Sequence, residues 1–156
     1  LLGYREAMAA AGLGLDPELM RVGSFSSDFS RRATLGFLKQ GAPPTAIFAS
    51  SDYLAIGAIR GLRAAGVKVP SEMSLVGFDH IQHASFARIN LTTTLLPQRD
   101  MGAAAAGLLM NRIDSKEQLS QQTVIFPTRL VVRGTTGPVR PARPRIRIAA
   151  QCHRTG

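Results

Sequence analysis

The sequence predicts an α/β fold with a parallel sheet and helices on both faces. Two short apolar runs, Ala46–Ala49 and Leu75–Phe78, each lead into an aspartate, and a helical pattern lies between them. A strand, a helix and a second strand of this kind bring both strand ends to one edge of a parallel sheet. Ligands of open α/β sheets bind at that edge. The two aspartates, Asp52 and Asp79, are therefore expected at a ligand site.

Three elements are predicted before the first of these strands. Apolar residues recur at helical spacing in Gly3–Ala11, and Gly12 follows as a stop. The short run Arg21–Phe25 predicts a strand. The next helix extends from Phe29 to about Lys39, because polar residues before it can cap its free N–H groups and two prolines follow it.

The middle of the chain is the strand–helix–strand unit itself. Thr45–Ala49 has the continuous apolar character of a strand buried on both faces. Ser50, Ser51 or Asp52 can cap a helix over Tyr53–Ala65, and a glycine ends it. Met73–Phe78 is predicted as a further buried strand.

The last third predicts weaker elements and then a tail. Residues 80–90 have no clear period and are expected to be irregular. The predicted elements that follow are an extended Leu91–Leu96, an alanine-rich helix Gln98–Arg112, and two short strands, Thr123–Phe126 and Thr128–Val132. The proline- and arginine-rich residues 137–156 predict a disordered tail.

The basic charge is concentrated in that tail. The chain has 19 basic and 10 acidic side chains and a net charge of +9. Five arginines and no acidic residue lie in 137–156, so the first 136 residues carry only +4. The folded part is therefore not expected to bind nucleic acid through its overall charge. The tail lacks aromatic residues to stack bases, which favours a solvated extension over a nucleic-acid-binding segment.

Several other classes of protein are excluded. The single cysteine, Cys152, rules out an internal disulfide and a cysteine-cluster metal site. No apolar run approaches the roughly 20 residues of a membrane span. Arg5 lies inside the apolar N-terminal segment, whereas a secretory signal has its charges before an unbroken apolar core. His80 and His83 have no third ligand at suitable spacing, so no metal is expected. The motifs of nucleotide-binding and hydrolytic enzymes are absent, which predicts a protein that is not an enzyme and needs no cofactor. The use of a single cysteine favours the reducing cytoplasm as its compartment.

An ordered set of motifs resembles a known family. The segment from Thr45 to His80, TAIFASSDYLAIGAIRGLRAAGVKVPSEMSLVGFDH, is followed by LTTT, MGAAAAGLL and FPTRLVVRGTT. Together, from Gly3 to about Thr136, these motifs resemble the effector-binding domain of the lactose/galactose-repressor (LacI/GalR) family of bacterial transcription regulators. The resemblance implies a fold like that of type I periplasmic sugar-binding proteins, in which two α/β subdomains close on a small molecule. It also implies a homodimer formed through this core domain, and a separate headpiece that binds operator DNA.

Against that family, the chain is expected to hold mainly the C-terminal subdomain, in residues 1–95 and 127–136. Residues 97–126 are an excursion that belongs to the N-terminal subdomain, and the headpiece is missing. We therefore expect the helix Gln98–Arg112 to lack much of its usual burial, the fragment alone to be weakly stable, and operator binding to be absent from this chain.

Four residues are the candidate effector contacts. Asp79 follows a buried strand, where its carboxylate can accept hydrogen bonds from sugar hydroxyls or an amine, and the resemblance implies an effector contact for the aspartate of this GFD motif. Its alternative role is to cap a turn. Ser51 and Asp52 end the neighbouring strand, with helix capping as their alternative. Phe29 stands where the resemblance implies an aromatic residue stacked on the ligand ring, with core packing as its alternative.

The expected function is therefore the effector-sensing and dimerisation portion of a ligand-responsive transcription regulator. Its small-molecule effector would be sugar-like or purine-like. The alternative is a fragment of a periplasmic-type sugar-binding protein of a transporter, which shares the fold.

Overall fold

The computed structural model describes residues 1–115 and 120–139, so the predicted tail lies mostly outside the described residues. Most of the predicted helices and strands are present, and two predicted strands are absent. In chain order the elements are α1 (Leu2–Ala10), η1 (Pro17–Leu19), α2 (Ser27–Leu38), β1 (Ala46–Phe48), α3 (Asp52–Ala64), β2 (Ser74–Asp79), η2 (Gln82–Ser85), β3 (Thr92–Leu95), α4 (Gln98–Asp114) and β4 (Arg129–Val131).

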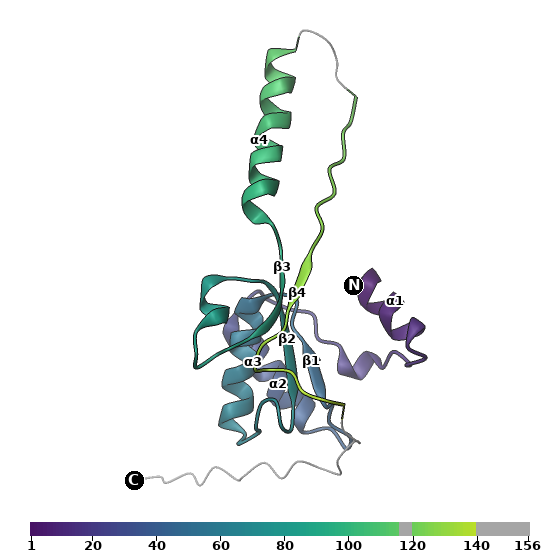
Figure 1. The fold of residues 1–156 in the computed structure, drawn as a ribbon. Helices are drawn as coiled ribbons and strands as arrows, with labels where there is room; N and C mark the ends of the chain where they lie inside the picture. Colours follow the sequence, from purple (N-terminus) through teal and green to yellow (C-terminus); the bar gives the residue numbers. More distant parts are fainter. Residues whose placement is uncertain (116–119, 140–156) are drawn as a thin grey trace.

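The sheet has the strand order β1-β2-β3-β4. β1, β2 and β3 run parallel, and β4 pairs antiparallel to β3 where the chain returns from α4 (Figure 1). Because β1, β2 and β3 are parallel, their carboxyl ends meet at one edge, as predicted. The α/β fold with a largely parallel sheet is confirmed.

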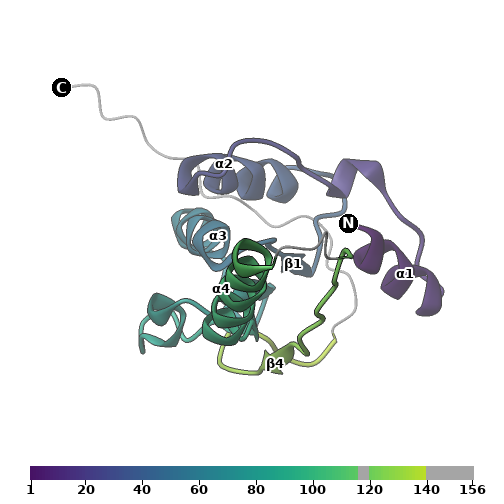
Figure 2. The ribbon, with the colours of Figure 1, turned by 90° about the horizontal axis from the view of Figure 1, so that it is seen from above.

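α2 and α3 pack on the same face of the sheet (Figure 2). Ile47 and Leu75, which are neighbours in register on β1 and β2, point toward these helices. One core cluster places Ala55 and Ile59 of α3 against Leu75, and a second places Leu38 of α2 near Leu62. These contacts fix the N-termini of both helices at the carboxyl edge of the sheet.

The opposite face is open around β1, so the prediction that this strand is buried on both faces was wrong. Phe48 of β1 is 53% exposed, whereas Leu75 on the helix-covered face is 0% exposed. β1 is the edge strand of the described sheet, and its alternate residues Ala46 and Phe48 are both exposed. A continuously apolar sequence is therefore not sufficient here to predict that a strand is buried on both faces.

Two predicted strands are absent from the described chain. Arg21–Phe25 forms no ladder within residues 1–115 and 120–139, and Val22 is 93% exposed. The sheet of the described chain ends at β1, so this segment has no strand beside it. Thr123–Phe126 is also irregular, with Ile125 88% exposed, because only the following residues of the returning chain reach β3.

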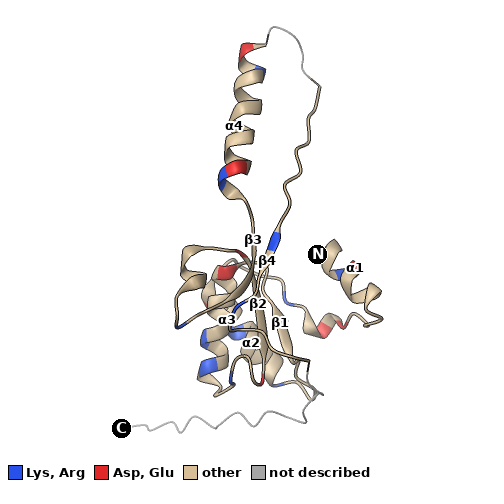
Figure 3. Cartoon of the chain, viewed as in Figure 1, with Lys and Arg blue, Asp and Glu red and all other residues tan. Residues whose placement is uncertain are grey.

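α4 extends away from the sheet (Figure 1). None of its residues is buried, in keeping with the expectation that this helix lacks much of its burial. Its exposed apolar side chains include Leu109 and Ile113. Within the described chain, no helix has the length and apolar character needed to cross a bilayer. Basic and acidic residues are interspersed along the described elements (Figure 3), in keeping with the modest charge of the folded part.

Candidate functional site

The carboxylate of Asp52 joins three elements at the carboxyl edge of the sheet. Asp52 is the first residue of α3 and is 0% exposed. Its Oδ1 accepts a hydrogen bond of 2.5 Å from Thr93 Oγ1 on β3, and its Oδ2 accepts one of 2.9 Å from the backbone N–H of Ile81. The N-terminal end of α3 also favours a negative charge at this position. Asp52 therefore links α3 to β3 and to the turn after β2, and it has no exposed surface that a ligand could contact.

Asp79 ends β2 beside this buried carboxylate and is half-buried. Its φ is 103° and that of His80 is 59°, so two consecutive residues other than glycine lie in the left-handed region. Such conformations cost about 1–3 kcal/mol each and concentrate at functional sites. Burial, and then the nearby charge of Asp52, raise the pKa of Asp79 above its ordinary value of 3.8. The structure therefore brings the two predicted aspartates together, one buried and one facing outward.

We predict that Asp79→Asn stabilises the fold at neutral pH. Because the pKa of Asp79 is raised in the folded state, the folded protein keeps a proton that the unfolded chain releases once the pH exceeds 3.8. Stability therefore falls as the pH rises from 3.8 to the raised value, and the full penalty remains above it. Asparagine removes the charge and tolerates a positive φ.

Urea unfolding at pH 7 and at a pH below 3.8 checks this prediction. The variant should be more stable than the parent at pH 7, and the charge-dependent part of that gain should vanish at the acidic pH. A variant that is less stable at pH 7 would contradict it.

Ser51 and Phe29 lie at the N-terminal ends of α3 and α2. Ser51 is 2% exposed, and its Oγ accepts a hydrogen bond of 3.2 Å from Leu54 N, as the N-cap of α3. Phe29 is half-buried in the first turn of α2, and its ring lies where a side chain on Gly23 would stand. The capping and packing roles of these residues are visible here, and their contact with an effector stays a prediction.

A pair of aromatic rings that sequence reasoning did not place at the site lies beside Asp52. The rings of Phe25 and Tyr53 stack at 5.6 Å with an interplanar angle of 20°. Phe25 is 68% exposed and Tyr53 is 46% exposed, although both side chains are large and apolar. Phe25 precedes Ser26, the N-cap of α2, and Tyr53 is the second residue of α3. Their position one residue from the predicted caps was the available signal.

Arg133 contacts both the turn after β2 and the residue before β3 from a distant part of the chain. Its guanidinium donates hydrogen bonds to Leu91 O at 2.7 Å and to His80 Nε2 at 2.6 Å. The Gln98 side chain donates to Asp79 O at 3.4 Å. His80 is thus held in a hydrogen bond with an arginine, and no group of three metal-binding side chains occurs in residues 1–115 and 120–139.

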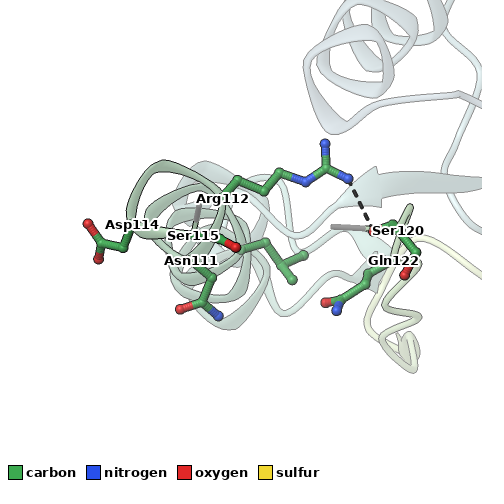
Figure 4. Close-up of a pocket in the computed structure, with 7 residues that line it drawn as sticks. Asn111, Arg112, Asp114, Ser115, Ser120 and Gln122 are labelled. Carbon is green, nitrogen blue, oxygen red and sulfur yellow. Dashed lines mark hydrogen bonds between the residues drawn. The ribbon is translucent and has the colours of Figure 1, made fainter. Parts of the chain in front are cut away.

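A cavity of about 600 Å³ lies elsewhere, at the far end of α4 (Figure 4). It is lined by the last turns of α4, including Asn111 and Arg112, and by Ser120 and Gln122 of the returning chain. Arg112 donates a hydrogen bond of 3.3 Å to Ser120 O across it. Residues 116–119, which connect its two sides, lie outside the described chain. None of the predicted site residues lines this cavity.

The family of the chain follows from comparison with known domains. The model of the periplasmic binding protein-like domain matches residues 1–136. This chain belongs to that family. The match covers all ten helices and strands of the described structure, and the predicted resemblance is confirmed.

The relatives that this chain matches include transcription regulators of the LacI family. The repressor PurR of Erwinia tasmaniensis is 34% identical over 142 residues, which are 90% of this chain and 42% of PurR. The structure of the regulator CelR in complex with cellobiose has a TM-score of 0.79 and 35% identity, and the match covers 85% of this chain and 40% of CelR.

A LacI-family regulator from Enterococcus faecium with bound ribose has a TM-score of 0.79 and 29% identity, over 88% of this chain and 51% of that protein. The chain thus spans about 40% of the length of the curated relatives that it matches. The relatives described here are regulators and not enzymes, and they favour a regulator over a transport protein.

Proposed function

We propose that this chain is the effector-sensing portion of a ligand-responsive transcription regulator, with Asp79 as its principal effector contact. The observation that carries the proposal is the placement of a half-buried carboxylate at the carboxyl end of β2, on a left-handed turn beside a buried aspartate. Ligands of α/β sheets bind at this edge. Membership of the periplasmic binding protein-like family supports the same assignment.

The groups at the edge suit a ligand with hydroxyls and a flat or apolar face. The Asp79 carboxylate accepts hydrogen bonds from hydroxyls or an amine. The exposed pair Phe25 and Tyr53 offers aromatic surface for the apolar face of a sugar or for a purine. The relatives with bound cellobiose and ribose support a sugar-like effector.

We propose that the effector acts by a population shift between two arrangements of the regulator. A ligand held between two subdomains favours the closed arrangement, and it does so only by the difference in its affinity for the two. The excursion 97–126 would pack in the second subdomain, which would cover the exposed face of α4. Operator DNA would be bound by a headpiece outside this chain, in a cytoplasmic protein without catalytic activity.

We further propose a homodimer through this domain. Phe86 is 49% exposed, and its ring lies 5.1 Å from that of His83. Exposed aromatic side chains of this kind are enriched at protein interfaces. The oligomeric state of the complete polypeptide in solution, measured by light scattering, tests this part of the proposal.

Calorimetric titration tests the effector site. The complete polypeptide encoded by the gene is titrated with ribose, cellobiose and adenosine, which sample sugars and a purine nucleoside. We expect at least one to bind, and Asp79→Asn to weaken that binding by about tenfold or more, since it removes a charge-assisted hydrogen bond. Asp16→Asn is the matched control, because Asp16 caps η1 in another part of the chain and asparagine also caps. Equal affinities of the Asp79→Asn variant and the parent would overturn the assignment.

A further inference from the structure

The buried Asp52 has a set of contacts that helix capping does not explain. The cap of α3 is Ser51, and the Asp52 carboxylate turns instead to β3 and to the chain after β2. Thr93, its hydroxyl partner, is itself 0% exposed. A carboxylate placed fully inside a protein is costly unless it is hydrogen-bonded, so these two bonds are required for it to remain there.

Gly77 makes room for this carboxylate. A side chain on Gly77 would overlap Asp52 Oδ1 and would approach Leu91 Cδ2 to 2.9 Å. Gly77 is the register partner of Thr93, so the carboxylate lies over the β2–β3 pair on the side of the hydroxyl that binds it. The sequence thus combines an aspartate, a glycine and a threonine from three elements to seat one buried group.

The contact with Ile81 connects this group to the outward-facing aspartate. Asp79 and His80 adopt positive φ angles, and the next backbone N–H, that of Ile81, donates to Asp52 Oδ2 at 2.9 Å. A single hydrogen bond, donated by the Ile81 N–H and accepted by a buried carboxylate, therefore closes the turn directly after the two strained residues. On its other side the turn is held by Arg133 at His80 and by Gln98 at Asp79 O.

We propose that Asp52 is a positioning residue that holds the Asp79–His80 turn in the orientation in which Asp79 meets the effector. Asp52 acts through the Ile81 N–H and is seated by Thr93, and it does not touch the effector itself. This inference rests on the proposed role of Asp79. It assigns the two aspartates different tasks: one recognises the ligand and the other preorganises the first.

Asparagine and alanine at position 52 separate geometry from charge. An asparagine carbonyl can still accept from Ile81 N–H, while its amide donates to Thr93 Oγ1, so Asp52→Asn keeps the turn closed and removes the charge. Asp52→Ala removes both contacts. Thr93→Val removes only the hydrogen bond from Thr93 to Asp52 Oδ1 and leaves the carboxylate itself in place. Its matched control is Thr135→Val, because Thr135 is also buried and bonded to Thr92 N and Leu75 O, away from the turn.

The test uses the complete polypeptide, with hydrogen exchange at the Ile81 amide and calorimetry with whichever of ribose, cellobiose and adenosine binds the parent. We expect Asp52→Ala to speed Ile81 exchange and to weaken binding by about tenfold or more, as for the loss of one charge-assisted contact. Asp52→Asn should restore slow exchange and most of the affinity. Thr93→Val should shift both readouts in the same direction as alanine, and Thr135→Val should leave both near the parent.

Two further results separate this inference from the proposed function. If Asp79→Asn weakens binding while Asp52→Ala and Thr93→Val leave Ile81 exchange and affinity unchanged, the positioning role is wrong and the site stands. If Thr93→Val and Thr135→Val change both readouts equally, Asp52 has only a structural role and the inference is overturned. If Asp52→Ala does not fold, Thr93→Val against Thr135→Val decides by the same two readouts. Exchange at Ile81 needs no ligand, so it shows whether Asp52 holds the turn even when none of the three probes binds.

Discussion

Gly77→Ala is expected to destabilise the fold by about 3–5 kcal/mol, the largest single effect that the structure predicts for a small substitution. A methyl group on Gly77 would overlap the Asp52 carboxylate and crowd Leu91. Overpacking of a core costs about 1–3 kcal/mol, and a displaced Asp52 would also lose its hydrogen bonds to Thr93 and Ile81, about 1–3 kcal/mol for each group left unsatisfied.

Urea unfolding monitored by circular dichroism at pH 7 measures this loss. The matched control is Gly36→Ala, because nothing stands within 4 Å of a β-carbon built on Gly36 in the interior of α2. That control should gain about 0.5–1 kcal/mol, since alanine favours a helix over glycine. A Gly77→Ala protein within 1 kcal/mol of the parent would show that the carboxylate is not seated against β2 as described.

Gly57→Ala is expected to cost about 2–4 kcal/mol and to separate the aromatic pair at the site. A side chain on Gly57 of α3 would overlap the carbonyl oxygen of Ser27 and would lie 2.9 Å from its Cα. These are backbone atoms of the first turn of α2, so the helix itself must shift, and such displacements cost more than a side-chain rotation. Phe25 precedes that turn and Tyr53 lies in the first turn of α3, so the shift would move one ring from the other.

The free energy of unfolding and the nuclear Overhauser contacts between the Phe25 and Tyr53 rings check this second prediction. Gly107→Ala is the matched control, because Gly107 lies inside α4 and nothing stands within 4 Å of its built β-carbon. The account requires weaker ring contacts in the Gly57 variant alone. Retained contacts together with a loss below 1 kcal/mol would contradict the close approach of α2 and α3.

Local patterns were sufficient to predict the elements that the core and the caps determine. The helices α2 and α3 follow from apolar spacing with serine caps before them, and β2 from a continuous apolar run. The meeting of Asp52 and Asp79 follows from the connectivity of parallel strands alone. These features depend on neighbours that are close in sequence or on general rules of topology.

Features that depend on distant partners could not be predicted in the same way. Arg21–Phe25 has the composition of a strand, but a strand needs a neighbour, and the described sheet ends at β1. Arg133 reaches His80 across 53 residues of sequence, and no local pattern indicates that contact. The division of work between the aspartates depends on Gly77 and Thr93, whose positions opposite Asp52 only the register reveals.

The central claim is that an effector is recognised at the carboxyl edge of β2, at Asp79. Chemical-shift mapping of the complete polypeptide, titrated with the probe that binds it, tests this claim most directly. We expect the largest chemical-shift changes at Asp79 and His80, together with Phe25 and Tyr53. Shifts confined to the cavity at the end of α4, around Asn111 and Gln122, with Asp79 unmoved, would contradict it.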